Sequence, residues 1–559
     1  MNDLFRYIHA TKFSIMIHRY SAVTLIFLAA TFSSYAQSWK AYPYHQAGSV
    51  LNFPRDEGYH PGEIVEWWYT NAHLKGDSTG TDYAMMFTYF YYPTFGFDGF
   101  RIFELSNENT GAFLTETTPC HYSTLDTSHL HIVATTGITG TSHEEWKTLD
   151  SARILKPFQY HLNGSMANGS FDLTYNTVKR PLMVGGTVFL YEGITGYTYY
   201  YSETEIDVSG TITMNGVTET VHGIAWIDRQ WGQFNPNNGE QYTWMSLQLS
   251  NGQDLNLWNI FNTASQIPDT STYRFCSVYV NDSTQTTMSN FTLDRLKYTY
   301  TANGTACYDQ KWRLTYGNVD LILTATHINN EVTLPLRFFE GSMLIEGTVD
   351  GVPVTGVGYV ELLHSFSKPN VYIASPAGHV NWDGSTPIIW RLLNPDDGRP
   401  VYYDVSVSTD SLANFTTIAN HLTDTSYNWT SSLAVGTEGW FRIKAYSIDT
   451  TLVNTVTSTA PFIFGATGID KLNNVVSVSA FPNPFEWQTV ILYELKQTEN
   501  IQMDILNMNG EVVKRFDKEF QSSGKHQLVW NANGVAAGIY FYRLKIGDSF
   551  MNGKLVKKD

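Results

Sequence analysis

Short aromatic and β-branched segments separated by turn residues run through most of the chain, and they constrain its fold more than any other feature. Gly, Asn, Asp and Pro divide these segments, among them DYAMMFTYFYYP, YTYYYSETEIDV, TWMSLQLSNGQDLNLWNIF and VDLILTATHI. Runs of this kind are typical of β-strands, whereas a helical period is hard to find beyond the N-terminal region. We therefore predict a nearly all-β protein whose many short strands close into barrels or sandwiches.

Composition limits the size of the folded units and the kind of partner. The 559 residues exceed what one core organises, and only 16% are charged whereas 15% are aromatic, so we expect several domains that each bury a core. The formal net charge of −17 disfavours nucleic acids and anionic membranes as partners, and no basic patch offsets it. A neutral or apolar ligand suits this composition better.

The N-terminal residues 1–36 have the pattern of a secretory signal peptide. A basic flank precedes the apolar run SAVTLIFLAATF, and Ser34 and Ala36 supply small residues at the −3 and −1 positions, which predicts cleavage after Ala36. The apolar run is too short to span a bilayer, so we expect no transmembrane segment in the mature chain. The sequence leaves open whether translation begins at Met1 or at Met16.

The three cysteines, Cys120, Cys276 and Cys307, are too few and too scattered for the disulfide framework of a small secreted protein. Two interpretations of them stay open. One is a single bridge between Cys276 and Cys307, and the other is a set of unpaired or half-paired thiols buried in the cores.

Two changes of composition divide the exported chain into three blocks. They lie at SKPN, residues 367–370, and in the stretch of residues 465–474. We predict a first block over residues 45–367, a middle block over residues 368–465 and a final block over residues 475–559.

The final block contains an ordered series of motifs, FPNPF, ILNMNGEVV, GKHQLVWN, GIYFYRL and the closing KLVKKD. FPNPF is typical of a turn that enters a strand, and Met508-Asn509-Gly510 is typical of a hairpin turn in which glycine supplies a positive φ. In this order the motifs resemble the C-terminal sorting domain of type IX secretion in Bacteroidota. The resemblance implies Sec export, engagement of the type IX secretion machinery, and a secreted or cell-surface location.

The middle block contains the alternating segments PIIWRLLNP, YYDVSVSTD and WFRIKAYS. Alternation of this kind fits sandwich strands with one buried face, and the block resembles a fibronectin type III or immunoglobulin-like module. We expect it to act as a spacer, with carbohydrate binding as the alternative.

The first block contains EWWY at residues 66–69 and AWIDRQWG at residues 225–232, together with KRPLMVGG, RFFEGSMLIEGTVDG and TGVGYVELL. These motifs resemble the carotenoid 1,2-hydratase and AttH-type family, a lipocalin-like superfamily that also looks related to fungal pericyclic cyclases. The resemblance implies two consecutive lipocalin-like β-barrels, here residues 45–235 and 236–367, with a pocket near their interface for a hydrophobic small molecule.

Strand parity groups the candidate site residues. If HGIAWID is extended, His222, Trp226 and Asp228 share one face. In VEWWYTNAHL the same rule puts Glu66 beside Trp68, and in TWMSLQL it puts Trp244 with two polar residues, as in a lumen that holds a ligand. The candidates are Asp228 and His222 for catalysis, and for substrate contacts Trp226, Trp231, Trp68, Glu66, Tyr201 and Trp244.

Hydration of an isolated alkene needs a strong acid donor, walls that exclude bulk water, and aromatic faces that stabilise a carbocation. The resemblance implies that an acid at the place of Asp228 is the proton source, and burial would raise its pKa. His222 would hold a water molecule or tune the acid. Relatives often carry an Asp where this chain has Thr243, and a His-Glu pair where it has QWGQF, so a second acid for dyad chemistry is missing from that position.

Structural roles compete with each of these functional ones. Asp228 could accept backbone N–H groups at a strand end or pair with Arg229. Glu66 could be a buried acid bonded to a neighbouring strand, and His222 could be a core histidine. The tryptophans could be core residues that contact no ligand.

We predict no cofactor and no metal. The chain shows no nucleophile elbow, P-loop or dinucleotide fingerprint, and His129 and His131 lack a third metal ligand at a suitable spacing. The leading hypothesis is a secreted enzyme that hydrates, isomerises or cyclises a polyene or terpenoid-like substrate by acid catalysis. The alternatives are a lipocalin that binds a hydrophobic ligand without transforming it, and a cell-surface structural or interaction protein.

Overall fold

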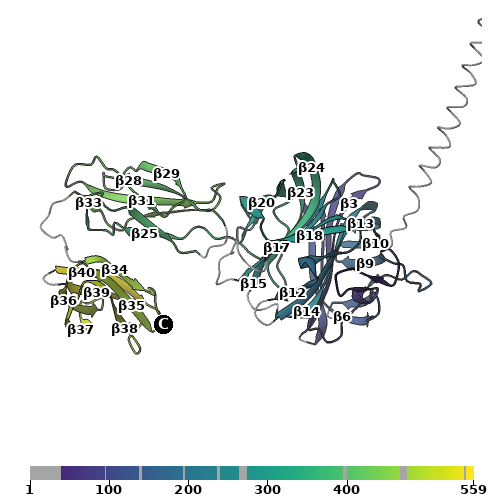
Figure 1. Cartoon of the computed structure of the whole chain (residues 1–559), viewed down its shortest axis with the longest axis horizontal. Helices are drawn as coiled ribbons and strands as arrows, with labels where there is room; N and C mark the ends of the chain where they lie inside the picture. Colours follow the sequence, from purple (N-terminus) through teal and green to yellow (C-terminus); the bar gives the residue numbers. More distant parts are fainter. Residues whose placement is uncertain are drawn as a thin grey trace, which may run out of the picture.

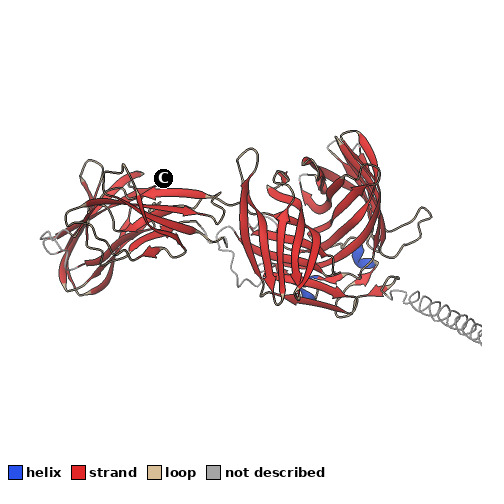
Figure 2. Ribbon diagram, turned by 90° about the horizontal axis from the view of Figure 1, so that it is seen from above, coloured by secondary structure: helices blue, strands red, loops and turns tan. Residues whose placement is uncertain are grey.

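The computed structural model describes residues 39–94, 96–137, 142–192, 196–235, 240–262, 274–394, 399–465, 475–546 and 549–559, so the predicted signal peptide lies outside the described residues. Strands make up nearly all of the regular structure (Figure 2), and the helical elements of the described part are the two 3₁₀ turns η1 (Arg55–Glu57) and η2 (Val184–Gly186). The all-β prediction is therefore confirmed. None of the described helical elements is long and apolar enough to cross a membrane.

Ten strands of the first block form a closed barrel. They are β3 (Val65–Gly76), β4 (Asp82–Thr94), β5 (Phe97–Asn107), β6 (Ala112–Leu125), β7 (His131–Thr136), β8 (Ser142–Lys147), β9 (Gln159–Met166), β10 (Gly169–Thr177), β13 (Gly196–Met214) and β14 (Val217–Gln233). From β3 to β10 each strand pairs with the next, β14 joins β3 to β13, and the pairing of β10 with β13 closes the ring. The short strands β11 (Leu182–Met183) and β12 (Phe189–Glu192) pair with β13, and a separate ribbon joins β1 (Tyr44–His45) to β2 (Asn52–Phe53).

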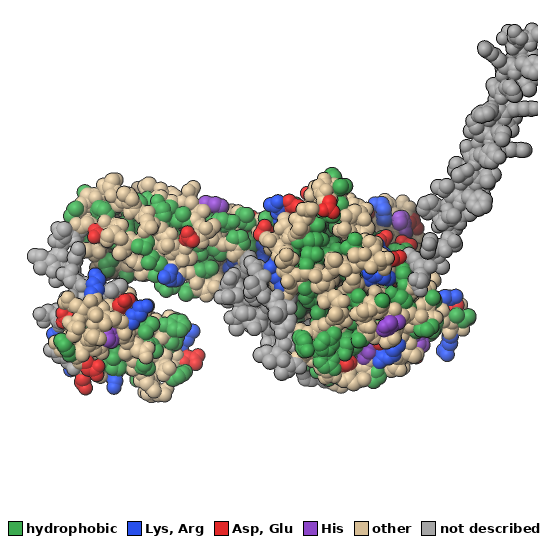
Figure 3. Space-filling view, in the orientation of Figure 1, with side chains coloured by type: hydrophobic (Ala, Val, Ile, Leu, Met, Phe, Trp, Pro, Cys, Tyr) green, Lys and Arg blue, Asp and Glu red, His purple; other side chains and the backbone are tan. Residues whose placement is uncertain are grey.

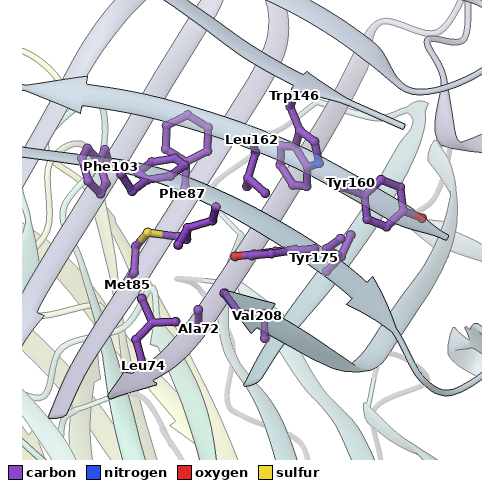
Figure 4. Close-up of a cluster of buried hydrophobic side chains, with 14 of the residues drawn as sticks. Ala72, Leu74, Met85, Phe87, Phe103, Trp146, Tyr160, Leu162, Tyr175 and Val208 are labelled. Carbon is purple, nitrogen blue, oxygen red and sulfur yellow. The ribbon is translucent and has the colours of Figure 1, made fainter. Parts of the chain in front are cut away.

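Apolar side chains fill the interior of this barrel (Figure 4). The inward positions of β3 are Trp68, Ala72 and Leu74, and they pack with Phe87 and Trp146 from other strands. Because side chains alternate along a strand, the intervening residues of β3 point outward. The outer face of the barrel is therefore free to meet the next sheet.

The second sheet is open. Its strands are β15 (Glu240–Leu249), β16 (Asp254–Asn262), β17 (Arg274–Asn281), β18 (Thr284–Met288), β19 (Thr292–Tyr300), β20 (Cys307–Tyr316), β21 (Val319–Ala325), β22 (Glu331–Val332), β23 (Phe338–Val349) and β24 (Val352–Leu362). They pair in the order β18-β17-β16-β15-β24-β23-β21-β20-β19, with β22 added to β23. No pairing among the described residues joins β18 to β19, so this unit is a half-barrel where the sequence predicted a second closed barrel.

The barrel and the half-barrel lie side by side (Figure 1). They pack through the outer face of β3, β4, β5 and β14. One apolar cluster joins Tyr69 and Trp226 of the barrel to Trp244 and Tyr359 of the half-barrel. Polar contacts cross the same interface, since the Tyr69 hydroxyl donates to Glu340 at 2.8 Å. The two units therefore share a partly polar interface, which is where a site can form.

The middle block is a sandwich of two sheets. One contains β25 (Val371–Ser375), β27 (Ile388–Leu392) and β30 (Ser426–Tyr427), and the other contains β26 (Asn381–Trp382), β28 (Tyr402–Ser408), β29 (Thr416–Leu422), β31 (Glu438–Tyr446), β32 (Val453–Thr457) and β33 (Phe462–Phe464). Trp382, Trp390 and Phe441 form its core. Leu452 also packs with Phe366 at the end of the first block, so the sandwich contacts the half-barrel.

The final block is a smaller two-sheet sandwich. Its sheets are β34 (Val475–Phe481), β35 (Gln488–Leu495) and β38 (Gly524–Asn531), and β36 (Glu499–Leu506), β37 (Val512–Gln521), β39 (Gly538–Ile546) and β40 (Ser549–Lys557). Gly510 lies between β36 and β37 with a φ of 81°, a conformation that glycine adopts without strain.

The three cysteines form no disulfide. Cys120, Cys276 and Cys307 are all buried and unpaired, so the bridge between Cys276 and Cys307 does not form.

The sequence predicts no basic patch on the surface. On the face shown in Figure 3, Lys and Arg side chains are interspersed with Asp and Glu side chains.

Candidate active site between the barrel and the half-barrel

Strand β14 positions the central residue of the site. It pairs with β3 without interruption from Val221 to Gly232, so its side chains alternate strictly along that length. Trp226 and Asp228 point out of the barrel toward the half-barrel, whereas Arg229 points inward. On the other side of β14, a register shift between Glu203 and Ile206 interrupts β13 close to the pair formed by Ser202 and Asp228. Such irregularities re-aim side chains and are common beside active sites.

A cavity of about 190 Å³ lies between the barrel and the half-barrel, and Asp228 borders it. Its aromatic lining consists of Trp67, Tyr69, Phe90, Tyr92, Phe100, Tyr200, Phe234, Tyr242, Trp244, Trp258 and Phe338. The aliphatic part consists of Val65, Ile102, Ile260, Pro335, Leu336 and Leu363, and the remaining polar residues are Asp228, Gln230 and Glu361. An apolar concave space with a few polar groups is the usual form of a small-molecule site.

Asp228 is 3% exposed, and its carboxylate accepts hydrogen bonds from three side chains. Ser202 Oγ and Trp226 Nε1 donate to Oδ1 at 2.5 and 2.7 Å, and the Tyr200 hydroxyl donates to Oδ2. Burial raises the pKa of Asp228 to about 7, although these three hydrogen bonds each lower it. A carboxyl with this pKa is half protonated near neutral pH, so it can donate a proton there.

Residues of the half-barrel fix the hydroxyl groups that bind Asp228. The Tyr200 oxygen accepts hydrogen bonds from Trp244 Nε1 at 3.0 Å and from Asn256 Nδ2 at 2.8 Å. Asn256 Nδ2 also donates to Ser202 Oγ at 3.0 Å. With two donors already facing the Tyr200 oxygen, its own proton is directed to Asp228. The acid is therefore oriented by both units.

A second carboxyl borders the same cavity. Glu361 lies near the end of β24, opposite Trp244 in the sheet, and accepts a hydrogen bond from the Tyr242 hydroxyl. Burial raises the pKa of Glu361 to about 7, the hydrogen bonds with Tyr242 and Glu340 lower it, and the charge of Asp228 raises it further. Two carboxyls that both titrate near neutral pH therefore face one apolar space.

The structure places three of the predicted site residues at or next to the cavity. Asp228 and Trp244 line it, and Trp226 holds Asp228 through its indole N–H. The three donors to the Asp228 carboxylate are the side chains of Tyr200, Ser202 and Trp226, so Arg229 is not among them. Arg229 instead faces the barrel interior, where it pairs with Glu66 at 2.6 Å.

His222 lies far from the cavity, contrary to our expectation. Its side chain is 63% exposed and its Nδ1 lies 2.6 Å from Asp77 Oδ1 on the barrel surface. It shares a face with Asp228, but six residues of extended strand separate the two by about 20 Å. A shared strand face does not bring two side chains close together, and we propose no catalytic role for His222.

Four other predicted residues point into the opposite side of the sheet. Glu66 is fully buried between Arg229 and His60, and Trp68 lies under the Arg229 guanidinium at 4.3 Å from the ring centroid. Trp231 stacks on His60 with centroids 3.8 Å apart, and Tyr201 packs in the same apolar cluster as Trp231. Their positions on β3, β13 and β14 have the inward parity, so they support the barrel and do not contact the cavity.

Several cavity residues were not predicted from the sequence. Trp67 and Tyr69 occupy the outward positions of β3, the face that parity grouped opposite Glu66 and Trp68. Glu361 supplies the second acid that seemed missing at Thr243, from a strand more than a hundred residues further along the chain. Alternation in TGVGYVELL does place Glu361 opposite the core residues Val360 and Leu362, and that was the available signal.

Across the described ranges, no group of three or more His, Cys, Asp or Glu side chains has the geometry to hold a metal ion. His131 instead contacts Glu145 at 3.1 Å, and His129 contacts Asp126 at 3.3 Å.

Comparisons with known proteins identify the family of the first block and the type of the final block. The AttH-like family model matches residues 44–365, more than half of the chain, and the secretion system C-terminal sorting domain matches residues 479–558. Kievitone hydratase of Fusarium solani subsp. phaseoli is 22% identical over 312 residues, which cover 53% of this chain and 82% of that protein. Dehydratase asqC of Emericella nidulans is 22% identical over 239 residues, which cover 41% of this chain and 65% of that protein.

Among solved structures, an AttH protein from Nitrosomonas europaea is 21% identical, with a TM-score of 0.48 over 57% of this chain and 98% of that one. Kievitone hydratase from Nectria haematococca is 18% identical, with a TM-score of 0.45 over 56% of this chain and 92% of that one. The sorting domain directs the protein through type IX secretion to the cell surface or the extracellular space. The chain belongs to the AttH-like family and carries a type IX C-terminal sorting domain.

Proposed function

We propose that this protein is a secreted enzyme that adds water to, or removes water from, an apolar unsaturated substrate by acid and base catalysis in the cavity between the barrel and the half-barrel. Isomerisation and cyclisation start from the same protonation step and belong to the same proposal. Asp228 is the proton donor and Glu361 is the base. The substrate class is polyene or terpenoid-like.

In the hydration direction, protonated Asp228 transfers its proton to one alkene carbon, and the π electrons form the new C–H bond. The other alkene carbon becomes a carbocation. A water molecule forms the C–O bond there, and its proton goes to the Glu361 carboxylate. Asp228 is left ionised and Glu361 protonated, and exchange of one proton between them restores the starting state. Dehydration runs through the same steps in reverse.

The cavity walls suit a cationic intermediate. Trp67, Trp244 and Trp258 present aromatic rings to the space that Asp228 borders, and such rings attract a cation. The aliphatic lining limits the access of bulk water, so that the water molecule bound at Glu361 is the one that reacts. Both effects favour proton transfer from a weak acid to a carbon atom.

One observation carries the proposal: a carboxyl with a pKa of about 7, Asp228, borders an aromatic cavity together with a second carboxyl. The names of the relatives agree with it, since a hydratase adds water and a dehydratase removes it. The middle sandwich, for which we propose a spacer role, and the sorting block lie outside the stretch of chain that lines the cavity.

Incorporation of oxygen from H₂¹⁸O into neutral alkenes tests the proposal. The mature chain is incubated with linear polyenes, terpenoid alcohols and alkenyl phenols, and products that gain ¹⁸O-labelled water are detected by mass spectrometry. Asp228→Asn and Glu361→Gln are each expected to lose activity by about a hundredfold or more, the usual size of a general acid or base contribution.

His222→Gln is the matched control, because His222 is a titratable residue on the same face of β14 but far from the cavity, and it should keep wild-type activity. Full activity in Asp228→Asn would contradict the proposal. Binding of these alkenes without labelled product would favour a ligand-binding lipocalin. Neither binding nor product would favour a structural or interaction protein.

A further inference from the structure

The cavity lining has an unusual balance of charge. Among the described residues that border it, none is Lys, Arg or His, whereas Asp228 and Glu361 are acids. Two more buried acids lie behind Glu361. Glu340 shares a hydrogen bond with Glu361, and Glu104 has both carboxylate oxygens buried without a hydrogen-bond partner in the described part of the chain. Among the described lining residues, no positively charged side chain offsets the two acids that border the ligand space.

The arginines on the strands that form the walls point away from the cavity. Arg229 follows Asp228 on β14, but its guanidinium donates to Glu66 and to three backbone carbonyl oxygens inside the barrel. Arg101 lies beside the lining residue Ile102 on β5, and it bonds Glu144 in the barrel interior at 3.2 Å. Both cations have fixed partners, so they cannot turn to meet an anionic ligand.

The rim of the cavity continues this pattern. Leu336 lines the cavity and is 45% exposed, and the neighbouring Leu334 is 62% exposed. Arg337 comes next in the chain, and two of its nitrogens bond the Glu331 carboxylate at 2.8 and 3.1 Å. A part of the ligand that extends past the rim therefore meets aliphatic side chains and an arginine that is already paired.

We propose that the cavity accepts neutral conjugated or aromatic molecules and rejects anionic ones, so that the substrate arrives as a free alcohol, phenol or hydrocarbon. An anion in this space would lose its hydration, would gain no cationic partner and would face two carboxyls. Diphosphate esters, coenzyme A thioesters and carboxylic acids are thereby excluded. A neutral hydroxyl, in contrast, finds hydrogen-bond partners in Asp228, Gln230 and Glu361.

This inference rests on the proposed function only where it calls the ligand a substrate. It then places the reaction after a step that removes or displaces the charged group. A terpenoid-like substrate that was built from a diphosphate must first pass through a transferase that moves the alkenyl group to a neutral acceptor, or through a hydrolase that releases the alcohol.

Two fluorescent probes with the same ring system test the inference. N-phenyl-1-naphthylamine is neutral, and 8-anilino-1-naphthalenesulfonate is the same molecule with a sulfonate. Titration of the full mature chain at pH 8 is expected to show binding of the neutral probe at least 30-fold tighter than binding of the sulfonate. Equal affinity within threefold, tighter binding of the sulfonate, or no binding of the neutral probe would each overturn the inference.

Two leucine variants localise the effect. Leu336→Lys puts a cation at the rim and should reduce the preference for the neutral probe by about fivefold or more. Leu412→Lys, at an equally exposed leucine of the middle block, should leave it unchanged, because Leu412 is also 45% exposed but does not line the cavity. An equal change in both variants would contradict the assignment to this cavity.

The same titration on the Asp228→Asn, Glu361→Gln double variant separates this inference from the proposed function. Loss of the two carboxyls should reduce the preference for the neutral probe, whether or not the wild type turns over an alkene. A double variant that rejects the sulfonate as strongly as the wild type would contradict the role of the acids in selection. If the wild type prefers the neutral probe but does not turn over any alkene, the proposed reaction is contradicted and the inference on ligand charge is not.

Discussion

The role of Asp228 depends on the balance between burial and hydrogen bonding around its carboxyl. Burial disfavours the charged form, and the bonds from Tyr200, Ser202 and Trp226 favour it. The net result is a pKa near 7 for Asp228, and Glu361 reaches the same range through burial and the charge of Asp228. Of two carboxyls with this pKa in one cavity, one can be protonated and act as the acid while the other is ionised and acts as the base.

Two tyrosine variants should move opposite limbs of the pH profile. Tyr200→Phe removes a hydrogen bond that lowers the pKa of Asp228, so the alkaline limb, where the acid is lost, should move up by roughly half to one pH unit. Tyr242→Phe acts in the same way on Glu361, so the acid limb should move up instead. The measurement is the rate against pH for each variant, and a shift of the same limb in both would contradict the assignment of roles.

Burial of Asp228 also makes stability depend on pH. Its pKa rises from 3.8 to about 7 on folding, so its stabilising contribution is complete below about pH 4 and is lost as the pH rises to about 7. Between pH 5 and 7 the loss amounts to about 2 kcal/mol, because one pKa unit corresponds to about 1.4 kcal/mol and Asp228 is already half ionised at pH 7. The Asp228→Asn variant has no titrating carboxyl at this position, so its free energy of unfolding lacks this pH-dependent contribution.

The melting temperature of Asp228→Asn relative to wild type should therefore increase by several degrees between pH 5 and pH 8. Thermal melts at the two pH values measure the change, and His222→Gln, with its exposed side chain, serves as the control. A constant or decreasing difference would show that Asp228 is ionised in the folded protein throughout this range.

Strand β14 shows what alternation in a sequence can and cannot predict. The pattern HGIAWID correctly placed Trp226 and Asp228 on one face, because period-two alternation is a local property of an extended chain. The same rule grouped Glu66 with Trp68 correctly, but it could not tell which face of β3 meets the cavity. That choice depends on the packing of the half-barrel, which involves residues far away in the sequence.

Glu361 shows that a sequence pattern cannot predict which distant strands pair. Its strand β24 pairs with β15, and this register brings Glu361 opposite Trp244 across the sheet. The pairing joins segments more than a hundred residues apart, so no local pattern encodes it. The all-β class, the sorting domain and the position of Asp228 could be predicted, whereas the open second sheet and the second acid could not.

Close pairing of β14 with β3 leaves no room for a side chain at Gly223. A Cβ atom there would lie 2.0 Å from the backbone carbonyl oxygen of His73, which cannot move without disturbing the strand. Gly223→Ala should therefore destabilise the protein by about 3 kcal/mol, in the upper range for overpacking. Urea unfolding measures this, and Thr220→Ala, at an exposed position of the same strand, is the control. Equal stability of the two variants would contradict the pairing register.

At the scale of the whole molecule, the candidate active site and the sorting domain occupy different parts of the chain. All described cavity residues lie between Val65 and Leu363, and the sorting domain matches residues 479–558. Export and the proposed ligand recognition therefore depend on different parts of the chain. The sorting domain can therefore be removed without removing any residue that lines the cavity.

Truncation after Gly465 should abolish delivery to the cell surface and leave the cavity intact. Immunoblots of cell fractions and culture medium measure delivery, and titration of the purified truncated chain with N-phenyl-1-naphthylamine measures the cavity. The expected dissociation constant is within twofold of the full chain. Loss of probe binding in a truncated chain that melts at the same temperature would show that the sorting block contributes to the site.

The central claim is that Asp228 is protonated near neutral pH in a water-poor cavity, and infrared difference spectroscopy tests it most directly. The spectrum of wild type minus Asp228→Asn isolates the C=O stretch of this one protonated carboxyl across a pH series. We predict a band that disappears with a midpoint near pH 7. A band that is already lost at about pH 4, the ordinary range for an exposed aspartate, would contradict the account.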